Sequence, residues 1–262
     1  MMKRSLLTLT FAVMVIFALS MGSAYAADDV MKATQGYGAG AWYTSIYGEV
    51  RDNAGNTVSA RSDLGHDNAL GFNGDLDFEL SDKWGLGLNF FYVKSTSTGY
   101  RVNRTINYAG TVVPVNDTVT STIKTTTTTL AIKYNLARNE DGQLDIQLSP
   151  KMITFEANAR AATAGNLFTP VDETVFIPTI GLSGKQRLSE RLYLYGNVEG
   201  MGYKSNSLID ARADLRWNFQ HPGWFATLGY RYYQVRLNDI NNTINRASLH
   251  WNGPVATLRY EF

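Results

Sequence analysis

Apolar and polar side chains alternate along much of this chain with the two-residue period of a β-strand. The segment 70–80 shows the pattern clearly. Its apolar face carries Leu70, Phe72, Leu76, Phe78 and Leu80. Such alternation predicts a strand with one apolar and one polar face. Because similar segments recur to the end of the chain, we expect an all-β, antiparallel protein.

Tight turns and longer connections divide the chain into ten alternating segments. The segments are roughly 42–50, 70–80, 84–93, one ending at 136, one beginning at 144, one around 176–182, 192–199, 209–219, 224–235 and one ending at 262. Tight turns are expected at 81–83, 138–143, 189–191 and 220–223, and longer connections at 51–69, 95–122, 160–173 and 238–246, with a tight one near 204–207. Short turns at one end and long loops at the other are typical of transmembrane β-barrels. The first strand is weakly marked, so eight or twelve strands are alternatives.

The final strand carries a recognisable end. Residues 251–262 read WNGPVATLRYEF, and the apolar face includes Leu258, Tyr260 and the terminal Phe262. This strand resembles the last strand of bacterial outer-membrane β-barrel proteins, which typically ends in Phe. The resemblance implies a transmembrane antiparallel up-and-down β-barrel in a Gram-negative outer membrane. It also implies that Tyr260 and Phe262 form the signal read by the barrel-assembly machinery. No particular subfamily is matched.

The start of the chain predicts secretion. Lys3 and Arg4 precede an almost wholly apolar stretch at 6–21, and Ala24-Tyr25-Ala26 fits the small-x-small cleavage rule. We therefore expect a signal peptide at 1–26 and a single barrel domain at 27–262. The alternative, an anchoring helix, needs about 20 apolar residues.

Composition narrows the class of protein further. The chain has 15 Tyr, 12 Phe and 5 Trp, no cysteine and a net charge of +1. The absence of cysteine excludes disulfides and thiolate sites, and no basic run suggests nucleic acid. A soluble β-sandwich is the alternative, but it needs no aromatic side chains at an interface. The aromatic residues near the inner turns predict a periplasmic girdle. They are Trp84, Trp217, Phe219, Trp224 and Phe262.

The face opposite the apolar one is strongly charged and is expected to line the barrel lumen. Its acids are Asp75, Asp77, Glu79, Asp145, Glu199, Asp210, Asp214 and Glu261, and its bases are Lys133, Lys151, Lys185, Arg187, Arg212, Arg216, Arg231 and Arg259. Both signs are equally represented, so the lumen is no funnel for ions of one sign. We expect an ion-pair network that fills the lumen, with Arg231 directly across from the charged column on the neighbouring strand. A thin water-filled path between the pairs is the alternative.

Candidate catalytic and ligand-binding groups are few. His66 stands beside Asp67 in the first outer loop, and Ser248 and His250 share a strand face. The chain shows none of the wider motif of omptin proteases, which are ten-stranded barrels, and no orienting carboxylate for a Ser–His pair. We expect a solvated His66. Neither metal-ligand spacing nor a phosphate-binding glycine motif occurs, so no catalytic residue, metal or cofactor is predicted.

These observations predict a function of broad class only. We expect a monomeric outer-membrane barrel with a structural or surface-binding role through its outer loops, of which 95–122 holds Tyr100, Arg101, Arg104 and Tyr108. The expected partners are outer-membrane lipid, lipopolysaccharide and, during biogenesis, the barrel-assembly machinery. A narrow porin-like passive channel is the first alternative, and a surface lipid- or peptide-hydrolysing enzyme is the second.

Overall fold

Ten long strands form the molecule. The computed structural model describes residues 35–167, 171–203, 206–219, 223–238 and 244–262. The long strands are β1 (Gly36–Asp52), β3 (Asn68–Glu79), β4 (Trp84–Arg101), β7 (Thr118–Arg138), β8 (Gly142–Ala161), β10 (Val171–Arg187), β11 (Leu192–Tyr203), β12 (Asn206–Asn218), β13 (Trp224–Asn238) and β14 (Ile244–Glu261). The short ones are β2 (Thr57–Ser59), β5 (Ile106–Tyr108), β6 (Thr111–Val113) and β9 (Gly165–Asn166).

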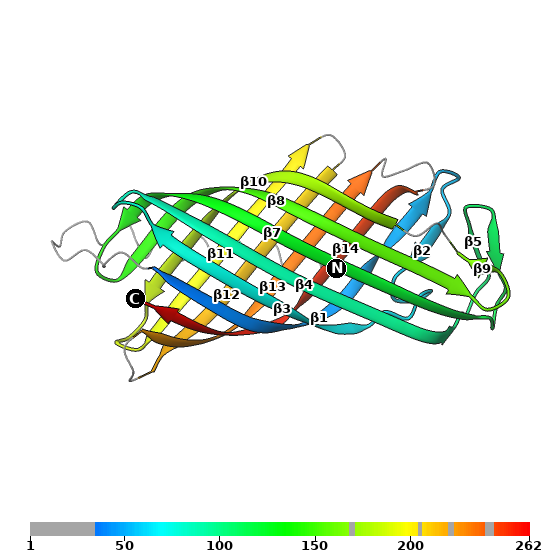
Figure 1. The fold of residues 1–262 in the computed structure, drawn as a ribbon, viewed down its shortest axis with the longest axis horizontal. Coiled ribbons are helices and arrows are strands. Elements are labelled where there is room, and N and C mark those ends of the chain that lie inside the picture. The colour runs from blue at the N-terminus through cyan, green and yellow to red at the C-terminus, as the bar shows by residue number, and fades with distance from the viewer. Residues whose placement is uncertain (1–34, 168–170, 204–205, 220–222, 239–243) are drawn as a thin grey trace.

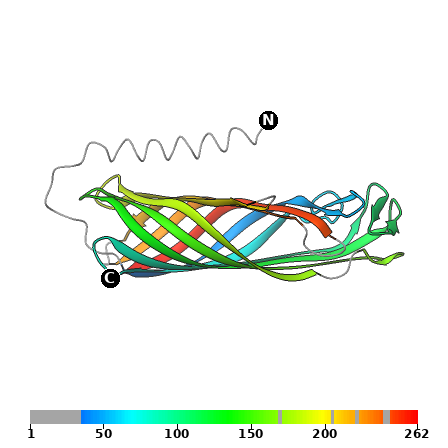
Figure 2. The same cartoon turned by 90° about the horizontal axis from the view of Figure 1, so that it is seen from above.

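The long strands close into one antiparallel barrel. Each pairs with the next along the chain, and β1 pairs with β14 from Gly36 opposite Glu261 up to Asp52 opposite Ile244. The strands tilt strongly against the long axis (Figure 1, Figure 2). Closure leaves no sheet edge among the long strands, which is what a strand structure needs in lipid. The predicted all-β, ten-stranded, up-and-down barrel is therefore confirmed.

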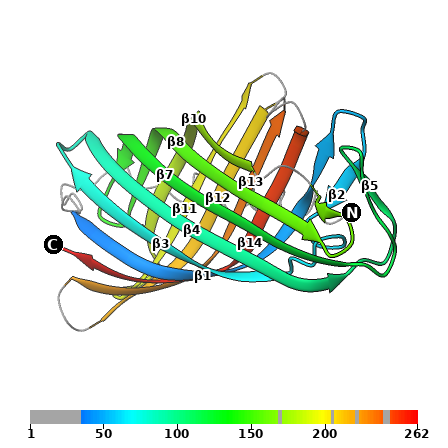
Figure 3. The same ribbon diagram turned by 45° about the vertical axis from the view of Figure 1, so that its right-hand side comes forward.

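Several strands continue well past the length that a membrane requires. β7 has 21 residues and β8 has 20, whereas a spanning strand needs about 9–11. The segment 95–122, predicted as one loop, consists mostly of the ends of β4 and β7 and of the hairpin β5–β6. In Figure 3 this extension forms a wall at the end where β2 and β5 lie, opposite the C-terminus.

The outward face carries an exposed apolar band. Its outward side chains include Leu228, which is 66% exposed, and the predicted girdle residues. The exposed girdle residues are Trp84, Trp217, Phe219, Trp224 and Phe262. Exposed side chains of this size along the barrel would be costly in water, and they match the lipid-facing band of a transmembrane barrel.

The lumen has two layers, which differs from the uniformly polar interior that we predicted. The half nearer the chain termini is lined by charged side chains. The half nearer the long loops is filled by apolar ones, which are buried to 1% or less. These include Trp42, Ile46, Phe91, Ile153, Leu208, Tyr233, Leu249 and Trp251. The outer half of the barrel is thus built like the core of a soluble protein.

The first two outer loops pack together at the outer end of the barrel, and we call this part of the molecule the cap. The connection between β1 and β3 contains β2, which pairs with β1, and its Val58 and Leu64 are buried with Ile106, Tyr108 and Val113 of the β5–β6 hairpin. Tyr108, which we named as part of the outer loop expected to bind at the surface, is fully buried. The apolar core therefore continues from the lumen into the cap.

Some predictions fall on residues that are not described. The signal peptide at 1–26, the turn residues 220–222 with His221, and the connection at 239–243 lie outside the described residues. Within the described ranges, no helix is long and apolar enough to cross a membrane.

Candidate functional site

The charged half of the lumen is the candidate functional site. Antiparallel strands place every second side chain inward, so charges spaced two apart stack in columns inside the barrel. β12 supplies Asp210, Arg212, Asp214 and Arg216, β14 supplies Arg259 and Glu261, and β3 supplies Asp75, Asp77 and Glu79. Regular alternation is thus what brings these predicted residues together.

The deepest group of charges centres on Asp210. Its carboxylate accepts hydrogen bonds from Nε and Nη2 of Arg231, at 2.9 and 2.7 Å. It also accepts one from Nζ of Lys151, at 3.1 Å. Lys151, which is only 1% exposed, also lies 2.6 Å from Glu199. Two bases and two acids thus neutralise each other. The residue directly across from Arg231 is Arg212, so Arg231 reaches its acid diagonally rather than straight across as we predicted.

Aromatic rings border this group on its outer side. The guanidinium carbon of Arg231 lies 4.5 Å from the ring centre of Phe91, 5.2 Å from Trp42 and 5.8 Å from Tyr233. The flat, weakly hydrated guanidinium can stack on rings while it binds a carboxylate. Arg231 therefore marks the boundary between the charged and apolar layers of the lumen.

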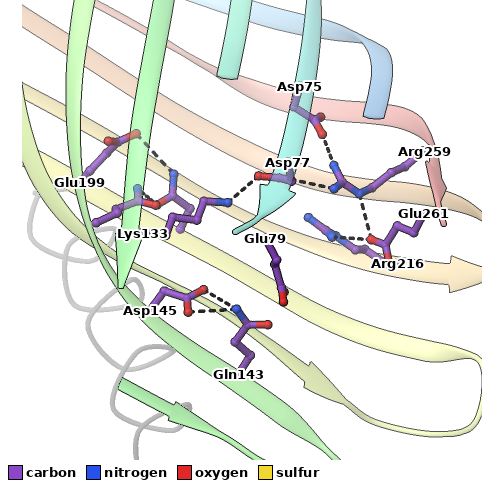
Figure 4. A network of polar contacts seen from close by, with 12 residues as sticks. Asp75, Asp77, Glu79, Lys133, Gln143, Asp145, Glu199, Arg216, Arg259 and Glu261 are labelled. Carbon is purple, nitrogen blue, oxygen red and sulfur yellow. Dashed lines mark hydrogen bonds and ion pairs between the residues drawn. The ribbon is translucent and has the colours of Figure 1, made fainter. Parts of the chain in front are cut away.

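A second group surrounds Arg259 near the inner end (Figure 4). Its guanidinium binds Asp75, Asp77 at 2.7 Å and Glu261 at 2.9 Å. Asp77 also receives Nζ of Lys133 at 2.5 Å. These contacts join β3, β7 and β14 across the seam where the first and last strands meet.

Two further pairs belong to the charged layer. Arg212 Nε lies 2.7 Å from a carboxylate oxygen of Asp214. Arg138, which we assigned to a turn, lies at the end of β7 and makes a two-pronged contact with Glu79 at 2.8 and 2.9 Å. A register irregularity between Asn135 and Ala137 shifts the alternation there, which concealed Arg138 in the sequence.

Arg187 differs from the other predicted lumen bases. Its side chain is 40% exposed and pairs with Asp141 in the neighbouring turn at 2.9 Å. It lies at the last position of β10, past the point where the barrel encloses it. Arg187 therefore belongs to the inner rim and not to the lumen.

Two adjoining cavities lie in the charged layer. The inner one is lined by turn residues Ser81 and Lys83 and so opens at the inner end. The deeper one extends to Lys151 and Arg231. Both are lined by Asp77, Lys133, Tyr195 and Arg216. The charged layer is therefore a vestibule that ends below the apolar layer.

His66 fixes the first outer loop inside the mouth of the barrel. Its Nδ1 lies 2.8 Å from Ser95 Oγ on β4, and its Nε2 lies 2.9 Å from Ser121 Oγ on β7. The ring is 1% exposed, which corrects our expectation of a solvated histidine. Burial lowers the pKa of His66 to about 4, so the ring is neutral at pH 7.

The cap is held by its own ion pair. Arg104, in the connection after β4, donates to both carboxylate oxygens of Asp63 at 2.9 and 2.6 Å. Asp52 accepts from the backbone of Asn56 and of Ala109, which lies in the β5–β6 turn. These contacts join the first and second outer loops, so Arg104, which we named as part of the surface-binding loop, is bound within the cap.

The residues considered for catalysis do not form a common site. His66 lies in the mouth of the barrel, whereas Ser248 and His250 lie on the outward face of β14, where the His250 ring stacks on Tyr47 at 5.1 Å between ring centres. Among the described side chains, no group of three or more His, Cys, Asp or Glu could hold a metal ion.

Comparison with known proteins identifies the fold. No family model and no curated protein sequence matches the chain. Among solved structures, the outer membrane protease OmpT from Escherichia coli matches with a TM-score of 0.60 and 14% identity, covering 90% of this chain and 99% of OmpT. The translocator domain of the autotransporter NalP from Neisseria meningitidis matches with a TM-score of 0.47 and 13% identity, covering 97% of each chain.

At such identities the likeness concerns the fold alone. The fold and the exposed apolar band agree with each other and with the terminal aromatic strand. The chain has the fold of bacterial outer-membrane β-barrel proteins.

Proposed function

We propose that the protein is a closed, non-conducting outer-membrane barrel with a structural or surface-binding role that its outer cap performs. The observation that carries this proposal is the apolar layer in the outer half of the lumen. Trp42, Phe91 and Trp251 reach this layer from three different strands and are buried to 1% or less. The vestibule below it is open at one end only.

An ion or polar solute would have to leave water to pass this layer. Transfer of an uncompensated charge into an apolar environment costs far more than thermal energy. The T-shaped contacts of Phe91 with Trp42 and Tyr233, at 5.5 and 4.8 Å, also give the layer a packed geometry. These features support closure and disfavour the narrow passive channel.

The cap offers a surface to the outside. Val112 of β6 and Val115 after it are about half exposed, and they stand near the end of a cap whose core is already buried. Hydrophobic side chains that a well-packed cap leaves outside are a common feature of protein contact surfaces. We therefore assign the surface role to the β5–β6 hairpin and its flanking turns. No contact in the described residues favours a hydrolytic role.

The positions of exposed cations and of the terminal aromatic residues support the proposed partners. Lys94 and Lys124 lie directly opposite each other on the outward face of β4 and β7, next to Tyr92 at the border of the apolar band. Lys124 also pairs with Glu156 at 2.5 Å, so Lys94 is the cation of this pair that best suits a phosphate of lipopolysaccharide. For assembly, Tyr260 packs against Trp224 and Phe262, with ring centres 5.2 and 6.0 Å apart. One chain closes its own barrel, which supports a monomer.

Conductance in a planar lipid bilayer tests the proposal. We expect the full mature chain to insert without ion-conducting steps, under conditions in which an established porin gives them. As an internal comparison, Trp42→Gly combined with Phe91→Gly opens the apolar layer and should give steps. Steady open steps from the unmodified protein would establish the channel alternative instead.

A further inference from the structure

Two cations of the inner cavity share a single carboxylate, while a further carboxylate of the same cavity, Asp145, is held in the described chain only by side-chain amides. Glu261 forms ion pairs with three cations, namely Lys185 at 3.1 Å, Arg216 at 3.5 Å and Arg259 at 2.9 Å. Arg259 has two further carboxylate partners, but within the described part of the chain Lys185 and Arg216 have no acid other than Glu261. One carboxylate therefore compensates two cations that depend on it alone.

Arg216 has hydrogen-bond donors to spare. It is 8% exposed, it lines both cavities, and its Nε has no acceptor among the described residues. Its contact with Glu261 is at the long limit for a hydrogen bond. The guanidinium carbon lies 3.9 Å from the ring centre of Tyr195, which holds the flat group in place. A buried guanidinium with unused donors is costly unless an acceptor reaches it.

A second polar group in the same cavity is also unused. Ser183 on β10 lines the inner cavity and is almost fully buried, and its Oγ has no hydrogen-bond partner in the described protein. It precedes Lys185 by two residues, so both side chains point to the same face of the strand. Ser183, Lys185 and Arg216 therefore border one space that holds unused hydrogen-bond donors, and Asp145 on β8 lies across from Ser183 in the same cavity.

We propose that this space is a binding site for a small oxyanion, a carboxylate or phosphate group that enters from the periplasm. The fork of a guanidinium matches the two oxygens of such a group, and the ammonium and hydroxyl groups can donate to the same ligand. The mouth lies at the turn that contains Ser81 and Lys83, at the inner end of the barrel. The site is separate from the cap and does not depend on the surface role proposed above.

Calorimetric titration tests this site. The full mature chain, folded in a nonionic detergent, is titrated separately with sodium phosphate and sodium acetate, with sodium chloride holding the ionic strength constant. We expect saturable binding of at least one oxyanion above the chloride background, and the two titrations distinguish a phosphate from a carboxylate ligand. Arg216→Gln should weaken the binding at least about tenfold, because it removes charge-assisted hydrogen bonds.

Arg187→Gln is the matched control. It removes the same charge from the same end of the barrel, but Arg187 does not line the cavities and pairs with Asp141 instead. Its binding should equal that of the unmodified protein. Ser183→Ala, which changes no charge, should weaken binding severalfold and decides the matter if Arg216→Gln does not fold. No saturable binding of either anion, or equal affinity in Ser183→Ala and the unmodified protein, would overturn the site.

Discussion

Removal of the Asp210 carboxylate should destabilise the barrel more than the loss of any exposed charge. In Asp210→Ala, Arg231 loses its two-pronged carboxylate contact, and Lys151 keeps only Glu199 and Thr129 as partners. The remaining guanidinium is enclosed by rings and strands, so it cannot turn to bulk water. Breaking a buried pair by removing one partner costs about 3–5 kcal/mol.

The deeper cavity beside Asp210 places the expected loss of stability at the lower end of this range. Asp210 and Arg231 both line the deeper cavity, so water that enters it can solvate part of the uncompensated charge. We therefore expect a loss of about 3 kcal/mol in the free energy of unfolding. Urea unfolding from lipid vesicles, followed by tryptophan fluorescence, measures this loss. Trp42 reports on the same place, because its ring centre lies 5.2 Å from the Arg231 guanidinium.

Asp141→Ala is the control for this measurement. Its pair with Arg187 is roughly half exposed on both sides, and such pairs contribute about 0–1 kcal/mol. If Asp210→Ala lost no more stability than Asp141→Ala, Asp210 would be freely hydrated. The charged layer would then not be a packed network.

The remaining predictions concern the strand faces, the contacts of His66 that hold the first outer loop, and assembly. Leu194→Asp should impair folding into vesicles, because it places a carboxylate toward lipid, while Tyr195→Asp, which faces the lumen cations, should be tolerated better; equal folding yields would contradict the assignment of faces. The pKa of His66 is lowered to about 4, so protonation of its ring is unfavourable while the first outer loop is packed in the barrel mouth. Its contribution is complete above the ordinary pKa of 6.5 and is lost as the pH falls toward 4, by up to about 3 kcal/mol. Proteolytic nicking of residues 53–67 should therefore rise between pH 7 and pH 4.5 in the unmodified protein but not in His66→Gln; parallel curves would refute this. Deletion of Phe262 should lower the amount of heat-modifiable, folded barrel in the outer membrane; an unchanged amount would count against the terminal signal.

In the inner half of the barrel, contact with lipid makes the inward and outward faces of the strands predictable from the sequence. In the inner half of β12, the outward side chains must be apolar and the inward ones are free to be charged. Asp210, Arg212 and Asp214 lie in the structure on the face that alternation alone places inward. Which acid binds which base depends on barrel tilt and on side-chain reach, which alternation does not specify.

The apolar layer was missed because the alternation changes phase within single strands. On β8, Ile146 and Leu148 face outward in the inner half, whereas Ile153 and Phe155 face inward in the outer half. Beyond the membrane, water replaces lipid outside, so polar side chains move outward and apolar ones fill the lumen. The sequence does contain this signal, as a swap of the apolar face after residue 152. The cap was missed for another reason, since its contacts, such as Arg104 with Asp63, join distant loops.

Cysteine labelling tests the two-layered lumen most directly, because the chain has no native cysteine. Asn197→Cys places a thiol in the deeper cavity, where the side chain is partly exposed, and Ser121→Cys places one beside His66 under the cap. In detergent both ends of the barrel meet water. We expect a small charged thiol reagent to modify position 197 readily and position 121 at least about a hundredfold more slowly, which corresponds to roughly 3 kcal/mol of protection. Equal rates at the two positions would show that water reaches the outer half of the lumen, and would contradict a closed barrel.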